Sequence, residues 1–245
     1  MTKLPIIPFD PHASTSPLPE WPAEDIVSGT RQHSGQLLFE DKARGLSAGI
    51  WEQGANESRW MDYPVNEFML LLEGEVVIVE EGRTVSIKAG ESFILPKGLR
   101  CRWTQPGHVK KFFVIFDDPS GLKNPGPLGT IKIDPGVKLS PSTPPAAAML
   151  LTPVPTQNTH DYFSDATGQL NIGIWDTTGY TRKLIPFPRH ELMHLLEGEV
   201  TMDDGAGTVQ RFKAGDTFFV PMGTPNSWTC KGYLRKIFVI FQPKQ

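Results

Sequence analysis

The sequence PVNEFMLLLEGEV at residues 64–76 returns as PRHELMHLLEGEV at residues 188–200. Nine of the thirteen positions are identical, at a constant offset of 124 residues. The same offset pairs Ile50 and Trp51 with Ile174 and Trp175, and after one inserted residue near Gly205 an offset of 125 pairs residues 113–116 with 238–241. Two copies of about 80 residues can each close a core, so we predict the duplication of a small β-barrel or sandwich.

Both copies carry the composition of β structure. Residues 75–79, 91–95 and 111–116 are rich in Val, Ile and Phe and are bounded by turn residues. No segment has a sustained helical period. We therefore predict an all-β chain, with an extended proline-rich arm at 1–25, one barrel at 26–120, a stiff proline-rich linker at 121–149 and a second barrel at 150–245.

The composition excludes several classes of protein. With 24 Lys and Arg against 27 Asp and Glu, the chain has no basic excess to hold a phosphate backbone, so we expect no nucleic-acid partner. Apolar runs end well short of the roughly 20 residues that a membrane helix needs, so we expect no membrane partner either. The N-terminal residues lack a continuous apolar stretch, which favours a cytoplasmic protein. Cys101 and Cys230 are too few for a disulfide framework.

Glycine and proline keep a fixed frame in each copy. The frame has the spacing of the second motif of cupins, and it consists of Gly90, Pro96 and Gly98 in the first copy and of Gly215, Pro221 and Gly223 in the second. On these residues the chain resembles the cupin type 3 family, formerly a domain of unknown function and related to the ethanolamine-utilisation and ureidoglycine aminohydrolase cupins. The resemblance implies a bicupin, two tandem antiparallel barrels of the RmlC-like jelly-roll type in one chain, which can pair into a homodimer.

The metal-binding residues of cupins are replaced in this sequence. The resemblance aligns Glu67 and Glu191 with the family's metal-binding glutamate, but no register supplies the three histidines in either copy. Because a divalent ion needs about three protein ligands, we predict barrels that hold no metal and no other cofactor. The resemblance also implies which other side chains face inward, and these are our candidate ligand-binding residues: Tyr63, Cys101, Trp103 and Gln105 in the first copy, and Phe187, Asn226, Trp228 and Cys230 in the second.

Glu67 and Glu191 are candidate acid-base residues, since a carboxylate facing a barrel interior is costly unless it is paired or takes part in chemistry. Each glutamate could instead be bonded to a Tyr or Trp at the barrel mouth. The tryptophans could fill the core or stack on a ligand. Basic residues such as Lys110–Lys111, which match Arg235–Lys236, would suit an anionic ligand, although Lys and Arg also keep strand edges soluble.

Residues 190–194 spell H-E-x-x-H, the zinc-protease motif. That chemistry requires a helix, in which four residues rise about 6 Å and both histidines reach one ion. The internal repeat aligns this segment with residues 66–70, which continue into a predicted strand, where four residues span roughly 13 Å. We therefore interpret the motif as part of a strand and not as a zinc site.

Three functions remain open on the sequence. The first is a metal-independent binding or sensory protein for a small molecule, with an anionic metabolite as the expected class. The second is a small-molecule enzyme similar to ureidoglycine aminohydrolase or another cupin hydrolase or isomerase, with Glu67 or Glu191 as the acid-base group. The third is a structural or dimerisation module with filled barrels.

Overall fold

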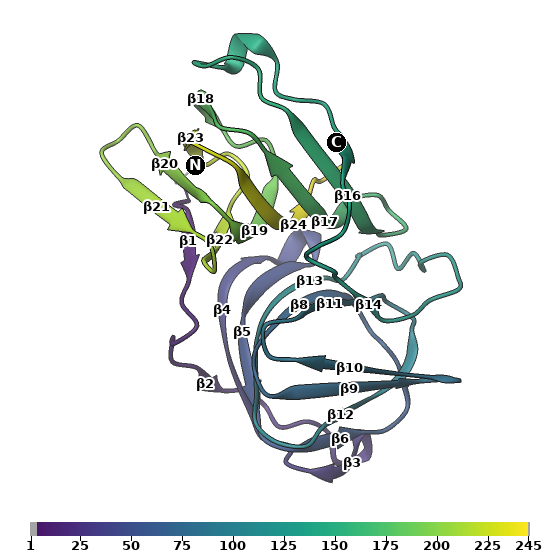
Figure 1. Cartoon of the computed structure of the whole chain (residues 1–245). Coiled ribbons are helices and arrows are strands. Elements are labelled where there is room, and N and C mark those ends of the chain that lie inside the picture. Colours follow the sequence, from purple (N-terminus) through teal and green to yellow (C-terminus); the bar gives the residue numbers. More distant parts are fainter. Residues whose placement is uncertain (1–3, 245) are drawn as a thin grey trace. The chain divides into compact units, whose positions relative to one another are not determined.

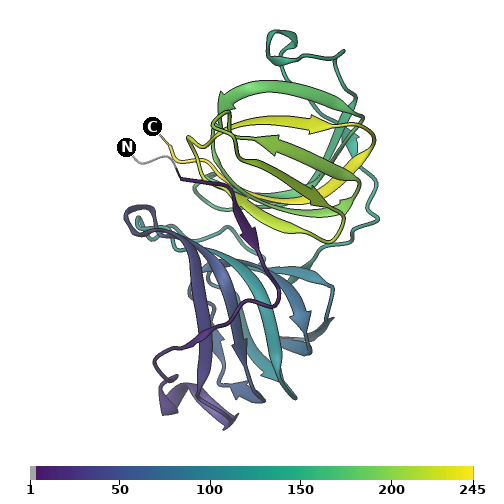
Figure 2. The same ribbon diagram turned by 90° about the vertical axis from the view of Figure 1, so that its left-hand side faces the viewer.

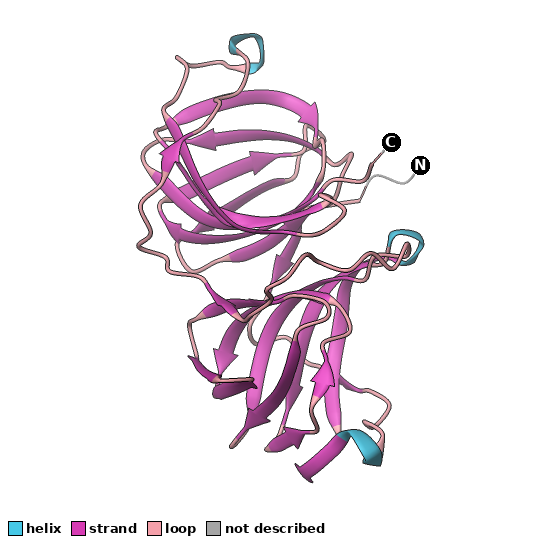
Figure 3. Ribbon diagram, turned by 90° about the vertical axis from the view of Figure 1, so that its right-hand side faces the viewer, coloured by secondary structure: helices cyan, strands magenta, loops and turns pink. Residues whose placement is uncertain are grey.

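The computed structural model describes residues 4–244, which form two compact units. The N-terminal unit comprises residues 9–133 and 165–167, and the C-terminal unit comprises residues 4–8, 134–164 and 168–244. Strands make up the regular structure apart from three short 3-10 turns (Figure 3), namely η1 (Ala23–Asp25), η2 (Lys42–Arg44) and η3 (Ala147–Met149). The predicted all-β class is therefore confirmed. Within residues 4–244, no helix has the length and apolar character needed to cross a membrane.

Two sheets form the N-terminal unit, and they curve around a common interior (Figure 1). The first sheet has the order β14-β11-β8-β13-β5-β4-β2, and the second has the order β10-β9-β12-β6-β3 with β7 paired to β12. The bounds are β2 (Ser16–Pro17), β3 (Ile26–Gly29), β4 (His33–Asp41), β5 (Leu46–Gln53), β6 (Asn56–Ser58), β7 (Met61–Asp62), β8 (Asn66–Glu73), β9 (Glu75–Glu80), β10 (Arg83–Lys88), β11 (Ser92–Leu95), β12 (Arg100–Gln105), β13 (Val109–Phe116) and β14 (Ile131–Lys132).

The C-terminal unit repeats this plan, as its curved strands show in Figure 2. One sheet has the order β1-β22-β19-β24-β17-β16-β15 and the other β18-β23-β20-β21. The bounds are β1 (Ile7–Phe9), β15 (Ser140–Pro141), β16 (Gln157–Ser164), β17 (Leu170–Thr177), β18 (Tyr180–Pro186), β19 (His190–Glu197), β20 (Glu199–Asp203), β21 (Val209–Lys213), β22 (Thr217–Val220), β23 (Pro225–Cys230) and β24 (Leu234–Phe241). Residues 134–149, which we expected in the linker, belong to this unit, as do residues 4–8 of the expected arm.

The duplicated sequence becomes a barrel wall because its side chains alternate along strand β8. Met69 and Leu71 enter the apolar core of the N-terminal unit, and Glu67 lies on the same face two residues earlier. Neighbouring β13 places Ile115 opposite Glu67 and Phe113 opposite Met69. A polar side chain on this face therefore points into the interior of the barrel.

In each copy, a phenylalanine ring lies close to the backbone of a glycine on the adjacent strand. A Cβ atom on Gly49 would lie 2.2 Å from the carbonyl oxygen of Gln36 and 3.1 Å from Cζ of Phe113. The repeat conserves this contact within the C-terminal unit, where a Cβ on Gly173 would lie 2.6 Å from Cζ of Phe238. Each glycine lets the phenylalanine ring of the adjacent strand lie across it.

We expect Gly49→Ala and Gly173→Ala each to lower the free energy of unfolding by about 1–3 kcal/mol, because the added methyl group overpacks the barrel wall. Urea titration followed by fluorescence measures the change. Gly107→Ala is the control, since a Cβ there meets nothing within 4 Å and should change stability by less than about 0.5 kcal/mol. Equal effects at all three glycines would contradict the packing argument.

Candidate functional site

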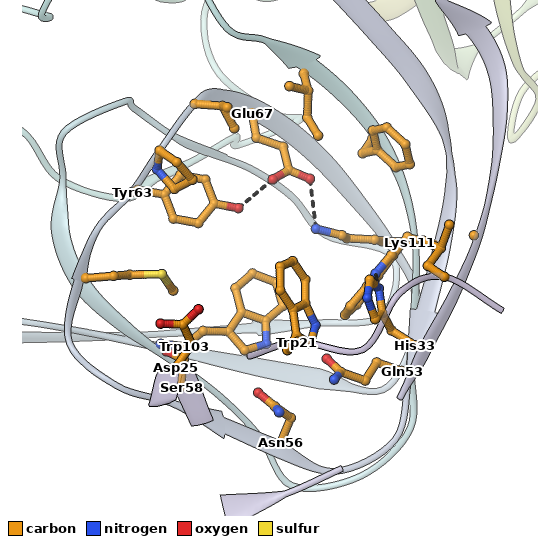
Figure 4. Close-up of a pocket in the computed structure, with 18 of the residues that line it drawn as sticks. Trp21, Asp25, His33, Gln53, Asn56, Ser58, Tyr63, Glu67, Trp103 and Lys111 are labelled. Carbon is orange, nitrogen blue, oxygen red and sulfur yellow. Dashed lines mark hydrogen bonds and ion pairs between the residues drawn. The ribbon is translucent and has the colours of Figure 1, made fainter. Parts of the chain in front are cut away.

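The interior of the N-terminal barrel contains a cavity of about 630 Å³ (Figure 4). Its walls are mostly apolar and rich in aromatic rings, with four of the chain's six tryptophans among the lining residues. Both sheets contribute to the lining, and so does the segment before β3. The aromatic lining residues are Trp21, Trp51, Trp60, Tyr63, Trp103 and Phe113, and the polar ones include Asp25, His33, Gln53, Asn56, Ser58, Arg59, Asp62, Glu67 and Lys111.

A buried carboxylate, ammonium and phenol meet at one end of this cavity. Lys111 Nζ lies 2.8 Å from Oε1 of Glu67, and the hydroxyl of Tyr63 donates a hydrogen bond to Oε2. All three side chains are more than nine-tenths buried. Burial, followed by the charge of Glu67, raises the pKa of Tyr63 well above its ordinary value. The phenol is therefore a fixed hydrogen-bond donor, and Glu67 is the counter-ion of Lys111.

Two indole rings enclose the lysine. Lys111 Nζ lies 4.9 Å from the ring centroid of Trp51 on β5 and 5.0 Å from that of Trp103 on β12. The indole N–H of Trp103 donates to Gln105 at 2.7 Å, and that of Trp51 donates to Nδ1 of His33 at 2.9 Å. Both rings are therefore held in place by hydrogen bonds at their edges.

The segment before β3 completes one wall of the cavity. The ring of Trp21 stacks on His33, with centroids 4.6 Å apart and planes 13° apart. The other ring nitrogen of His33 lies 2.7 Å from the carbonyl oxygen of Pro19, which can only accept. His33 is therefore the Nε2–H tautomer, and its Nδ1 accepts from Trp51.

The structure separates the candidate residues of the first copy into two groups. Tyr63, Glu67 and Trp103 line the cavity together. Gln105 lies behind them and holds the Trp103 ring, while its amide nitrogen donates to the carbonyl oxygen of Gln53 at 3.0 Å. Cys101 packs in the apolar core, where burial and then the charge of Glu80 raise the thiol pKa to about 12. A thiol in that state is a poor nucleophile at neutral pH.

The C-terminal barrel repeats the central arrangement. Lys236 Nζ lies 2.7 Å from Oε1 of Glu191, and it lies 4.9 Å and 5.3 Å from the ring centroids of Trp175 and Trp228. The second oxygen of Glu191 is paired with Arg189, whose Nε lies 3.1 Å from Oε2, whereas in the N-terminal barrel Tyr63 bonds to the second oxygen of Glu67. Burial raises the pKa of Glu191, but Lys236 and Arg189 outweigh burial and hold the pKa below its ordinary value. Glu191 is therefore an ionised structural counter-ion.

Larger side chains enter the C-terminal barrel at two positions. The offset of 124 aligns Tyr180 with Asn56 and Arg182 with Ser58, both of which line the N-terminal cavity. The Tyr180 ring stacks near Trp228 at 6.1 Å, and the guanidinium of Arg182 donates to the side-chain oxygen of Asn226. Burial lowers the pKa of Arg182. An aromatic ring and a guanidinium group therefore occupy the positions where the first copy has the smaller, cavity-lining Asn56 and Ser58.

The remaining candidates of the second copy lie in the apolar core of this barrel. Phe187 replaces Tyr63 and belongs to the apolar core. The buried Cys230 donates to the carbonyl oxygen of Gly232 at 2.9 Å. The H-E-x-x-H segment is strand β19, which confirms the predicted strand, and burial lowers the pKa of His194 to about 4.

Comparison with known proteins agrees with this duplicated architecture. The model of the EutQ-like cupin domain matches residues 40–113 and 164–238, which together exceed half of the chain. The chain belongs to the EutQ-like cupin family. The predicted pair of tandem cupin barrels is thereby confirmed.

Three solved cupin-type structures illustrate the range of relatives. A protein of unknown function of the DUF861 family from Pseudomonas syringae pv. tomato is 27% identical, with a TM-score of 0.77 over 96% of this chain and 98% of that chain. YlbA from E. coli, also of the DUF861 family, is 12% identical, with a TM-score of 0.53 over 93% and 88%. A putative glyoxylate-induced protein from Pseudomonas aeruginosa is 15% identical, with a TM-score of 0.55 over 94% and 85%. The last two show the fold alone. No curated protein matches the chain.

The donors in this cupin do not fit the divalent metal that other cupins bind. Glu67 already accepts from Tyr63 and is paired with Lys111, whose ammonium would repel a second cation at this distance. Lys236 and Arg189 hold Glu191 in the same way. Across residues 4–244, no three His, Cys, Asp or Glu side chains gather to form a metal site. A side-chain cation stands beside the glutamate that the family resemblance aligns with the metal ligand.

The inward-facing lysines of both cupin barrels were not assigned from the sequence. Lys110–Lys111 matches Arg235–Lys236 in the repeat, but on the sequence these residues suit an anionic ligand or a soluble strand edge equally well. The alternation of side chains along β13 could have predicted the inward position of Lys111, since Lys111 lies two residues before the inward-facing Phe113 and therefore on the same face of the strand. Trp51, which matches Trp175, likewise stands out in the sequence only as a repeated residue.

We expect Lys111→Met to lower the free energy of unfolding of this cupin by about 3–5 kcal/mol, because it leaves the Glu67 charge buried without a partner. Denaturant titration measures the loss, and Lys111→Met with Glu67→Gln should recover part of it. Lys110→Met is the matched control and should cost about 1 kcal/mol, because Lys110 Nζ donates to the carbonyl oxygen of Ala13 at 3.3 Å and acts on the half-buried Glu52 by charge alone, without a close ion pair among the described residues. A similar loss in both single variants would contradict the ion-pair argument.

Proposed function

We propose that the N-terminal barrel binds a small, flat, uncharged organic molecule and does so without a metal. The cavity of about 630 Å³ with its aromatic walls is the observation that carries the proposal. Its volume falls in the range of roughly 300–1,000 Å³ that is usual for small-molecule sites. Trp21 is exposed over 41% of its surface although it lines this cavity, which suits a ring that gains contacts when a ligand arrives.

The charges along the cavity favour an uncharged ligand over the anion that we expected from the sequence. Glu67 and Lys111 form an ion pair, so together they add no net charge to the cavity. Of the other charged lining residues, Asp25 and Asp62 are acidic and only Arg59 is basic. An anionic ligand would therefore meet no excess of positive charge.

The C-terminal barrel differs from the N-terminal barrel at two of the positions that line the cavity. Tyr180 and Arg182 stand where the N-terminal barrel has the smaller Asn56 and Ser58, and Arg182 already bonds to Asn226. We propose that this second barrel is a filled structural copy. The third alternative from the sequence thus applies to one half of the chain and the binding function to the other.

The test is ligand binding by the full chain, measured by tryptophan fluorescence and thermal shift with a panel of flat uncharged aromatic compounds. We expect Ser58→Arg, which copies the C-terminal barrel, to weaken binding at least about tenfold, a change that corresponds to 1.4 kcal/mol. Arg182→Ser is the reciprocal control in the other unit and should leave binding unchanged.

Two results would reject the binding proposal. One is binding that EDTA abolishes, since the proposed site uses no metal. The other is unchanged binding by Ser58→Arg, which would place the ligand outside the cavity.

Catalysis is a second candidate, because Tyr63, Glu67 and Lys111 bring proton donors and acceptors together at the end of a cavity. In this alternative, Glu67 moves a proton to or from the bound molecule. Glu67→Gln should then lower kcat by about 100-fold or more for any compound that is turned over. Glu191→Gln is the matched control and should leave kcat unchanged. Equal activity of both variants would reject the catalytic role, whichever compounds bind.

A further inference from the structure

Two buried amides lie in the cavity at the end opposite Glu67 and Tyr63 (Figure 4). Gln53 ends strand β5 and Asn56 begins strand β6, and they are only 4% and 6% exposed. Gln53 Nε2 donates to the carbonyl oxygen of Thr30 at 3.0 Å, and Asn56 Nδ2 donates to the same oxygen at 2.8 Å.

The shared acceptor fixes the orientation of both amides. A backbone carbonyl oxygen can only accept hydrogen bonds, so each amide must turn its nitrogen toward Thr30. The side-chain oxygens Oε1 of Gln53 and Oδ1 of Asn56 are consequently directed away from Thr30, and Figure 4 shows them on the side of the cavity. Within residues 4–244, neither oxygen receives a hydrogen bond from another side chain or from the backbone, and both oxygens stay open to the cavity that their residues line.

Acceptors of this kind indicate what the cavity recognises. A ligand that fills this end of the cavity closes both oxygens off from water, and an acceptor that is then left without a partner costs about 1–3 kcal/mol unless the ligand supplies an N–H group. A ligand of the same shape without the N–H group leaves the acceptors unpaired and is rejected. The carboxylate of Asp25, which also lines the cavity, adds a third acceptor and no donor.

We propose that Gln53 and Asn56 determine specificity, and that they select flat ligands that present N–H donors on one edge. The ligand class is thus an uncharged nitrogen heterocycle or cyclic amide, stacked against the tryptophans with its N–H edge toward the two amide oxygens. The inference rests on the binding function proposed above and adds the chemistry of the ligand.

The C-terminal barrel has no such pair at the corresponding positions, which are Thr177 and Tyr180. The hydroxyl of Thr177 donates to the carbonyl oxygen of Thr178 and lies 3.4 Å from Nε2 of Gln157. The acceptor pair is therefore a property of the hollow barrel and not of the repeated frame.

Two matched probes test the inference: benzimidazol-2-one, which has two N–H donors on one edge, and its 1,3-dimethyl derivative, which has none. We expect the wild-type chain to bind the first probe at least about tenfold more tightly in isothermal titration calorimetry, since each bond contributes about 0.5–1.5 kcal/mol. Asn56→Leu and Gln53→Met should each reduce this preference about threefold or more. Each single variant keeps one donor on Thr30, so both should fold.

Gln157→Met removes a buried amide from the other unit and is the control that should keep the full preference. Equal affinity for the two probes, or a preference that survives both substitutions, would overturn the inference and leave the binding function intact. Failure of benzimidazol-2-one to bind would also overturn it, and the panel of flat compounds then decides the binding function separately.

Discussion

A buried ion pair between glutamate and lysine, enclosed by two indole rings, organises the interior of each barrel. In the N-terminal unit Glu67, Lys111 and Trp51 belong to one sheet and Trp103 to the other, so the ammonium joins the two sheets. Removing two charges from water is costly, and the pair is favourable only when each remaining lone pair and proton finds a partner. This requirement explains why Tyr63 or Arg189 occupies the second oxygen of the glutamate in its own barrel.

The same central pair supports two different interiors. One copy surrounds it with Asn56 and Ser58 and keeps a cavity, whereas the other surrounds it with Tyr180 and Arg182. A duplicated chain can keep one copy for stability while the other changes its lining, because the two cores are closed separately. The positions that differ lie on β6 and β18, and the positions that carry the ion pair do not differ.

The fold could be predicted from the sequence, and the site only in part. The repeat, the alternation of apolar residues and the Gly and Pro frame of residues 90–98 specify barrels, since these features act locally along each strand. The pairing of Lys111 with Glu67 depends on the register between β8 and β13, which no local pattern encodes. Gln53 and Asn56 lie outside the family's motifs, and their role follows only from the shared contact with Thr30.

Strand β1 borders β22 at the edge of the C-terminal sheet, although more than 200 residues separate them in the sequence. During translation, residues 7–9 leave the ribosome long before their partner strand is made, and such a distant pairing forms late. Until then β22 presents unpaired backbone groups, which are a template for aggregation. The free edge of β22 is therefore closed by a segment from the far end of the sequence, so the two ends of the chain must meet before this sheet is complete.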